Sequence, residues 1–184
     1  MNPTQELTHE HAIVNQALKI LAHLCDRVET GAPPNTAHIA QLLEFITEFV
    51  DRCHHAKEEE LLFPAMEQAG GAQIKPMVAQ MLAEHDTGRS FGRKLKQAFA
   101  DYAAGQAHAL PALVDNARRY IRILEPHIVK EDTILYVVAE QVLAQAQQTA
   151  LTAGFAKIEA ERAGPGKHEE FHQLIHQLAK VYVK

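Results

Sequence analysis

The sequence predicts an all-α protein, an up-down-up-down four-helix bundle with a helical extension at its C-terminal end. Three observations support this fold class. Aliphatic residues recur at helical spacing, strong helix formers such as Ala, Leu, Glu, Gln and Lys are abundant, and alternating runs of β-branched residues are missing. Four long helical segments joined by short connections pack most simply as an antiparallel bundle.

Helix breakers divide the first half of the chain into three helices. The first is expected to begin at Thr4 or Thr8, acting as N-cap, and to end at the breaker 31–34. The second runs from about Asn35 to the glycines at 70–71, and Pro64 is predicted to bend it or end it early. A third helix follows, starting between residues 73 and 76 and ending around Gly105.

The fourth helix starts near Pro111, a favourable first-turn residue, and continues to about Gln145. Pro126 interrupts its pattern and predicts a kink, because proline removes one backbone hydrogen bond. We divide the chain into a bundle, residues 1–146, and an extension, residues 147–184. The extension is expected to hold two helices, at 149–163 and 167–183, separated by a 164–166 hinge, and to pack on the bundle or on a second subunit.

Bulk composition excludes several classes of protein. The 184 residues suit one domain, and a net charge of −5 without a Lys/Arg cluster argues against nucleic-acid binding. No apolar stretch approaches the roughly 20 residues that a membrane span needs. Two cysteines in no metal or redox motif, together with a polar N-terminal stretch, favour a reducing, cytoplasmic location. The 12 histidines are the anomaly, because histidine is the commonest metal ligand.

A pair of motifs occurs twice in the same order. An EH dipeptide is followed by an HxxKE segment, first as Glu10-His11 and His54 to Glu58, then as Glu84-His85 and His127 to Glu131. The spacing is nearly equal, 74 residues between the EH histidines and 73 between the HxxKE histidines. One His-x-x-x-Glu arises easily by chance, but two copies with this spacing describe two halves of one site.

Helical geometry indicates that these residues face the core. Residues four apart share a helix face, so His127 and Glu131 lie together, within the apolar stripe that contains Leu124 and Leu135. The second and third helices show the same pattern around their motif residues. On the first helix periodicity does not choose between His9 and His11. The repeat favours His11, because it follows a glutamate as His85 does, and His9 is then a surface residue.

The predicted site offers four imidazoles and two carboxylates. Buried carboxylates need compensation, which metal ions supply directly. Buried His-Glu pairs without metal are the alternative. Six ligands exceed the need of one tetrahedral zinc, so the repeat suggests two ions bridged by the glutamates, and this mixed donor set favours iron over manganese or zinc. The predicted ligands are His11, His54, Glu58, His85, His127 and Glu131.

These motifs resemble the hemerythrin-like HHE cation-binding domains. The resemblance covers about Leu7 to Glu140 and rests on EH, HxxKEE with LFP, EHD and HxxKE in that order. It implies a four-helix bundle holding a non-haem di-iron centre, oxo- or hydroxo-bridged, that binds oxygen, responds to nitric oxide or iron status, or helps repair iron centres. The four motif histidines would be terminal ligands, and Glu58 and Glu131 would bridge.

One position departs from the family pattern. Oxygen-carrying hemerythrins have a second histidine four residues after the third-helix ligand, where this chain has Arg89. A missing ligand leaves an open coordination position, which favours reactive chemistry over plain oxygen transport. Tyr120 and Thr47, seven residues before His127 and His54, are further candidates to face the cavity and assist the site, although a buried hydroxyl bonded to backbone is commoner.

The remaining charged motif residues have ordinary interpretations. Lys57, Lys130, Glu59 and Glu60 are expected to point outward as solvated charges. The stripe of His168, His172 and His176 is interpreted as a solvated polar face, with weak metal binding or contact over the bundle mouth as alternatives.

Three functional hypotheses follow. The first is a di-iron protein that binds or responds to oxygen, peroxide or nitric oxide in sensing, detoxification or iron handling. The second is a di-iron enzyme, such as an oxidase, a nitric oxide or peroxide reductase, or an iron-centre repair protein. The third is a metal-free interaction module whose tail contacts a partner. The expected partners are a diatomic gas or peroxide and, through the extension, a second copy of the chain.

Overall fold

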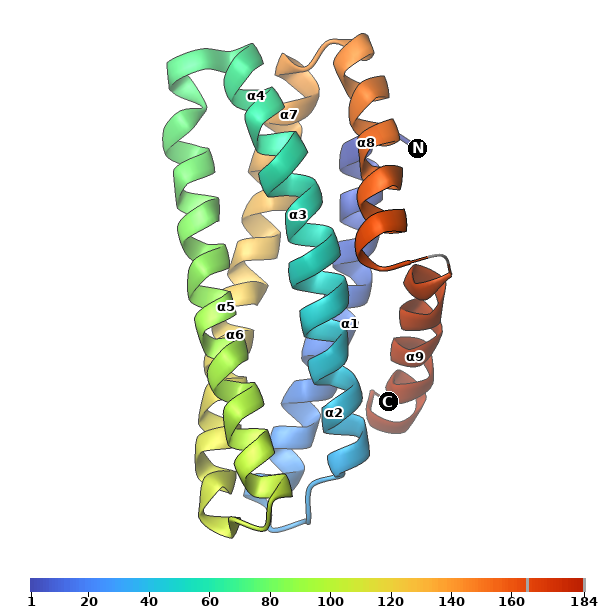
Figure 1. Ribbon diagram of the computed structural model, residues 1–184. Coiled ribbons are helices and arrows are strands. Elements are labelled where there is room, and N and C mark those ends of the chain that lie inside the picture. The colour runs from blue at the N-terminus through green and yellow to red at the C-terminus, as the bar shows by residue number, and fades with distance from the viewer. Residues whose placement is uncertain (165, 184) are drawn as a thin grey trace.

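Four antiparallel helical rods form a bundle in the computed structural model, which describes residues 1–164 and 166–183 (Figure 1). The first rod is α1 (Pro3–Glu29) and the third is α5 (Lys75–Ala103). Within the described residues there are helices and turns but no β-strand. The prediction of an all-α, up-down-up-down bundle is confirmed.

The second rod consists of five segments that follow one another without a break. They are α2 (Thr36–Phe45), a π-helical segment (Ile46–His54), α3 (His55–Lys57), a second π-helical segment (Glu58–Leu62) and α4 (Phe63–Gly70). Pro64 was expected to bend this rod or to end it early, and the early end does not occur. It lies in the first turn of α4, where the fixed φ of proline and its missing N–H are tolerated.

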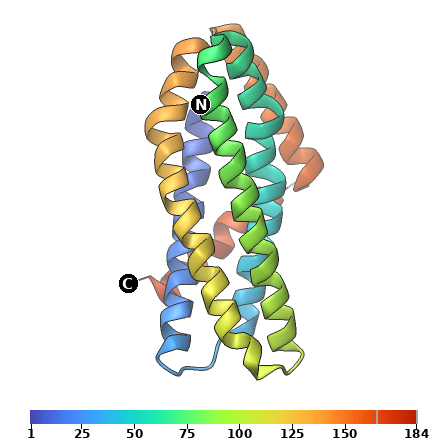
Figure 2. The same cartoon turned by 90° about the vertical axis from the view of Figure 1, so that its left-hand side faces the viewer.

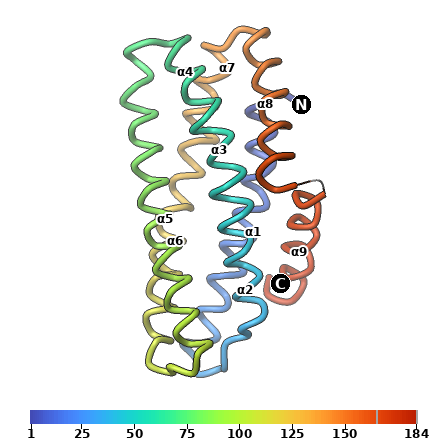
Figure 3. The backbone as a smooth tube through the Cα atoms, viewed as in Figure 1, coloured from blue at the N-terminus to red at the C-terminus, as the bar shows by residue number. Residues whose placement is uncertain are grey.

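The fourth rod contains a π-helical segment at the equivalent place. It begins with α6 (Leu110–Lys130), continues through the π-helical segment Glu131–Leu135, and ends with α7 (Tyr136–Val142). Pro126 lies inside α6. Short 3₁₀ turns, Gly71–Gln73 and Ala107–Ala109, precede α5 and α6. The short connections between the rods can be followed along the chain in Figure 3.

The N-cap of the first helix lies two residues before Thr4, the earlier of the two expected N-caps. Asn2 is the cap: its side chain accepts a hydrogen bond from the Gln5 backbone N–H at 2.8 Å. The Gln5 side chain accepts one in return from the Asn2 N–H at 3.1 Å, which completes a capping box. Thr4 instead donates to Glu140 at 2.6 Å and so ties the start of α1 to α7.

Two apolar clusters fill the bundle, one towards each end. One includes Leu7, Leu62 and Leu135, and the other includes Val14 and Leu124. On each rod the repeated motif lies between residues of the two clusters. The bundle therefore carries a polar layer across its middle, closed above and below by apolar side chains.

The extension lies along one side of the bundle. It consists of α8 (Gln145–Arg162) and α9 (Lys167–Tyr182), which contact α1, and α8 also contacts the second rod. Figure 2, viewed from the α5 side, shows it behind the bundle. Phe155, Phe171 and Ile175 are at most 5% exposed, so both helices bury apolar side chains against the rods. The proline of the expected hinge, residue 165, lies outside the described residues.

Candidate metal centre

Six polar side chains from the four rods meet in the layer between the apolar clusters. They are His11 of α1, His54 and Glu58 of the second rod, His85 of α5, and His127 and Glu131 of the fourth rod. Each is at most 2% exposed, so bulk water does not solvate them. The structure thus brings together all six residues that were predicted as metal ligands.

The four imidazoles form two pairs that face each other through Nε2. The Nε2 atoms of His11 and His54 lie 3.0 Å apart, and those of His85 and His127 are also 3.0 Å apart. Each pair joins one EH histidine to one HxxKE histidine. The repeat in the sequence is consequently a repeat in space, with one half contributed by the first two rods and the other by the last two.

The two glutamates lie between the imidazole pairs. Glu131 Oε2 is 3.2 Å from His11 Nε2 and 3.1 Å from His127 Nε2. Glu58 Oε2 is 3.4 Å from His85 Nε2 and 3.7 Å from His54 Nε2. Each carboxylate reaches one imidazole of both pairs, which is the placement that a bridging ligand requires.

Each of these imidazoles turns its other nitrogen, Nδ1, to a carboxylate of the surrounding shell. The contacts are His11 to Asp132 at 2.8 Å, His54 to Glu10 at 2.7 Å, His85 to Glu59 at 2.7 Å and His127 to Glu84 at 2.9 Å. Because an ionised carboxylate only accepts, Nδ1 must donate, and Nε2 of the neutral ring keeps a free lone pair. Metal-binding histidines are oriented by contacts of this kind.

This arrangement fits bound cations. Two Nε2 lone pairs that face each other at 3.0 Å repel unless a metal ion or a proton lies between them. In addition, Glu58 Oε2 and both carboxylate oxygens of Glu131 are buried without a hydrogen-bond partner among the described residues. Leaving such charge uncompensated in a protein interior is strongly unfavourable. Two metal ions would satisfy both requirements with the donor atoms present.

The pKa values also show that the two buried carboxylates lack positive charge when no ion is bound. Burial raises the pKa of Glu58 well above the usual carboxyl value, and the charge of Glu131 raises it further. Burial also opposes ionisation of Glu131, but the three imidazoles that approach it most closely, those of His11, His127 and His85, outweigh burial and hold that pKa well below the usual value. For His11, burial opposes the charged form, yet Asp132 and Glu131 raise its pKa to about 9. Without a metal ion, the proton on His11 therefore supplies part of the positive charge that the buried carboxylates require.

The first EH glutamate belongs to a buried ion network, which sequence reasoning did not assign. Glu10 is 1% exposed, and Lys57 Nζ lies 2.6 Å from its Oε1. Lys57 also contacts Glu6 at 2.8 Å and Glu159 of α8 at 3.3 Å. The expectation that Lys57 points into solvent is wrong: it is 0% exposed, because α8 covers it.

The second half of the repeat has the same lysine–glutamate contact, but α8 does not cover it. Lys130 pairs with Glu84, and its side chain is 32% exposed. Lys130 is therefore half-buried rather than fully solvated as expected. Glu60 is exposed, as expected, and pairs with Arg162 of α8 at 2.9 Å.

Arg89 acts on the site through Glu59. Its guanidinium donates to Glu59 Oε1 at 2.8 Å and to Asp86 at 2.9 Å, and the same Glu59 oxygen accepts from His85 Nδ1. Burial opposes ionisation of Glu59, but the hydrogen bonds that it accepts from His85 and Arg89 outweigh burial and lower its pKa. Glu59 is thus not the solvated charge that was expected, since it orients a ring of the centre.

The two hydroxyl candidates from the sequence lie apart from the six residues. Thr47 donates to the Leu43 carbonyl oxygen at 2.8 Å, the common arrangement for a helical threonine. Tyr120 is buried, and its hydroxyl has no hydrogen-bond partner among the described residues. Its ring borders an apolar cavity with Val14 and Phe45. Neither hydroxyl contacts a carboxylate or imidazole of the centre.

Tyr136 is the hydroxyl that does reach the centre. It donates to Glu58 Oε1 at 2.7 Å, and its ring stacks on His11 with centroids 5.5 Å apart. Regular α spacing from Glu131 points to Leu135 as the neighbour on the same face. Because the π-helical turn inserts one residue, it is Tyr136, five residues after Glu131, that takes this place on the face of the centre. The sequence carried no clear signal for this register change.

The histidine stripe of α9 is only partly a solvated face. His168 Nε2 lies 3.0 Å from Glu10 Oε1, which connects the extension to the carboxylate that orients His54. His172 is half-buried and its ring lies tilted against that of His168, with centroids 4.6 Å apart, whereas His176 is exposed. The expected solvated stripe is therefore wrong for His168 and correct for His176.

None of the described helices is long and apolar enough to cross a lipid bilayer. The family model of the hemerythrin HHE cation binding domain matches residues 2–139. Uncharacterized proteins of Mycobacterium bovis and Mycobacterium tuberculosis are 24% identical over 177 residues, which is 96% of this chain and 68% of each relative. No solved structure matches the chain significantly. The family match spans the four rods that carry the motifs, and the chain belongs to the hemerythrin HHE cation-binding domain family.

Proposed function

We propose that this protein holds two iron ions between the four rods and uses them to bind a small oxidant or gas: oxygen, peroxide or nitric oxide. The observation that carries the proposal is a group of three buried carboxylate oxygens that have no hydrogen-bond partner in the described part of the chain, beside two pairs of opposed Nε2 atoms. His11 and His54 would be terminal ligands of one ion, and His85 and His127 of the other. Glu58 and Glu131 would bridge.

The donor set supports iron. It combines imidazoles with carboxylates and includes no thiolate, a mixture that suits iron and that differs from all-oxygen magnesium or calcium sites. If both carboxylates bridge, these six residues give each ion about four donor atoms, whereas octahedral coordination takes about six. Bound iron would supply open coordination positions and electrons for a small ligand.

The surroundings support a ligand of only a few atoms. A pocket of about 140 Å³ between the second rod and α5 is bordered by Thr47, Asp51, Arg89 and Gly92. Asp51 lies 3.2 Å from the imidazole of His55, the buried residue that follows His54 and stacks on His85. The pocket admits a diatomic molecule or peroxide more readily than a larger substrate.

One observation favours turnover as a second candidate function. The buried Tyr136 hydroxyl is a proton donor in contact with Glu58. Its position allows proton delivery to a reduced small molecule, as a peroxide or nitric oxide reductase requires. Catalytic consumption of peroxide or nitric oxide by the iron-loaded protein with a chemical reductant would distinguish an enzyme from a binding or sensing protein.

Metal analysis of untagged protein, combined with absorption spectra of the oxidised and reduced forms, tests the proposal. Two irons per chain and oxo-bridge absorption are expected, and one zinc or no metal would contradict it. Glu131→Ala should lose at least one iron, because it removes a bridging carboxylate. Glu125→Ala is the matched control, an exposed glutamate on the same rod, and should keep both. Retention of two irons in Glu131→Ala would rule out the role assigned to Glu131.

A further inference from the structure

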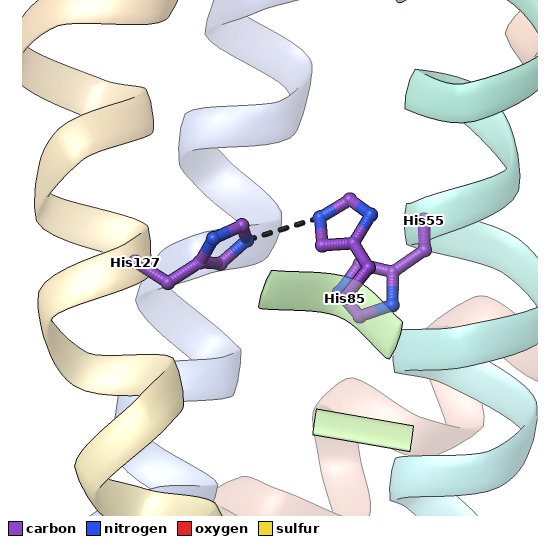
Figure 4. Close-up of side chains that lie close together, drawn as sticks. All are labelled: His55, His85 and His127. Carbon is purple, nitrogen blue, oxygen red and sulfur yellow. Dashed lines mark hydrogen bonds between the residues drawn. The ribbon is translucent and has the colours of Figure 1, made fainter. Parts of the chain in front are cut away.

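His55 is a fifth imidazole in the polar layer. It is 2% exposed and belongs to α3, directly after His54. Its ring stacks on that of His85, with centroids 3.9 Å apart and planes inclined by 19°. Figure 4 shows His55, His85 and His127 converging from three rods, with His55 and His85 overlapping. A fully buried polar ring at this place needs a reason beyond packing, because an apolar side chain would fill the same space without desolvation.

The environment of His55 repeats the pattern of the four imidazoles described above. Its Nδ1 lies 3.2 Å from Asp51 Oδ1, so a carboxylate faces Nδ1 here as well. Neither atom has a hydrogen-bond partner among the described residues, so the 3.2 Å contact is a close approach that a reorientation of the ring would convert into a hydrogen bond. With Nδ1 directed to Asp51, Nε2 is the nitrogen left for a ligand.

The distances allow a shared ion. One nitrogen from each of His55, His85 and His127 lies within 4.8 Å of the other two. Two nitrogens bonded to one metal at about 2.1 Å are at most about 4.2 Å apart, so a pair at the 4.8 Å limit must approach by at least about 0.6 Å to share an ion. Because an imidazole lone pair lies in the ring plane, the His55 ring must also turn out of its stack on His85 to direct a nitrogen to the same ion.

We infer that His55 is a ligand of the ion that His85 and His127 hold. The inference rests on the proposed function, since it needs two bound ions. It makes the centre asymmetric: one ion has two imidazoles, from His11 and His54, and the other has three. The ion of His85 and His127 would then have one open coordination position fewer than the ion of His11 and His54.

Anaerobic titration with Co²⁺ alone tests this inference, because Co²⁺ absorption reports the number of nitrogen donors as well as the stoichiometry. Wild type should bind two Co²⁺. His55→Phe keeps an aromatic ring against His85 but has no donor atom. It should bind one Co²⁺ normally and the second at least about tenfold more weakly, with altered visible bands. His9→Phe, at an exposed histidine, is the control and should match wild type.

Imidazole rescue separates ligation from packing. In His55→Ala, added imidazole should restore tight binding and the original bands of the second Co²⁺. If His55→Phe does not fold, this variant alone tests whether His55 is a ligand. Two Co²⁺ with unchanged affinity and bands in either variant would overturn the role of His55 and leave the two-ion proposal intact. Fewer than two Co²⁺ in wild type would overturn both. Weakened binding that imidazole does not restore would assign His55 a packing role and overturn the inference.

Discussion

Lys57 and Lys130 occupy equivalent positions in the two halves of the repeat, and replacing each with methionine measures what burial does to the same ion pair. Lys57→Met leaves the carboxylate of Glu10, which is 1% exposed, without its closest cation. Breaking a buried pair costs about 3–5 kcal/mol. We expect the lower end of that range, because His54 and His168 still contact Glu10. Lys130→Met breaks a pair whose side chains are 32% and 22% exposed, which costs at most about 1 kcal/mol.

Thermal unfolding followed by far-ultraviolet circular dichroism measures the difference. For a chain of this size 1 kcal/mol corresponds to about 2–4 °C in Tm. Lys57→Met should therefore lower Tm by about 6–12 °C and Lys130→Met by no more than about 4 °C. Both variants are compared at the same excess of metal, because ligand binding itself raises Tm. Equal losses in the two variants would refute the assignment of the effect to burial by α8.

A second substitution tests whether charge, rather than packing, causes the loss. Glu10→Gln, added to Lys57→Met, removes the unpaired buried charge and leaves a neutral amide that can still accept from His54. The double variant should recover about 1 kcal/mol or more relative to Lys57→Met. A double variant that is less stable than Lys57→Met would show that the lost packing of the lysine stem dominates.

Three further predictions concern the metal, the contact of α9 with Glu10, and the two cysteines. Removal of the metal should lower stability by about 2.7 kcal/mol for each ion, about 5.4 kcal/mol for two, relative to protein at a free metal concentration 100-fold above Kd. Urea unfolding measures the difference, and unchanged stability would contradict a site inside the folded bundle. His168→Ala should cost about 1 kcal/mol and speed amide hydrogen exchange in α9, because it loses a bond to a charged carboxylate, whereas the exposed His176→Ala should change neither. Burial raises the pKa of Cys25 to about 11 and that of Cys53 to about 12, so an aromatic disulfide reagent at pH 8 should label both thiols only in denaturant, and rapid labelling of the native protein would count against their burial.

The helices were predictable because local signals agree with the tertiary structure. Helical periodicity and the breakers at 31–34 and 70–71 placed the first three rods within a few residues of where they lie. Helix ends that depend on a single tertiary contact were harder to predict. The choice of Asn2 over Thr4 as cap depends on Thr4 being used by Glu140, a residue of another rod.

The candidate ligands were predictable for a different reason. A buried His-x-x-x-Glu pair is unfavourable in an apolar stripe unless something binds it, and its duplication makes coincidence a poor explanation. The repeat also selected His11, which the structure buries at the centre, over His9, which is exposed. The role of the EH glutamates was not predictable in the same way, since their contacts with His54 and His127 connect different rods.

Sequence periodicity and duplication were sufficient for the bundle and for the six converging side chains, because both follow from which residues share a helix face. The tertiary structure decided everything that depends on a neighbouring rod or on a change of helical register. It buried Lys57 under α8 while leaving its counterpart Lys130 half-exposed, and it brought Tyr136 to Glu58 through a π-helical turn. The physical reason is that burial and hydrogen bonding are properties of packed surfaces, and two identical motifs acquire different surroundings when only one of them is covered.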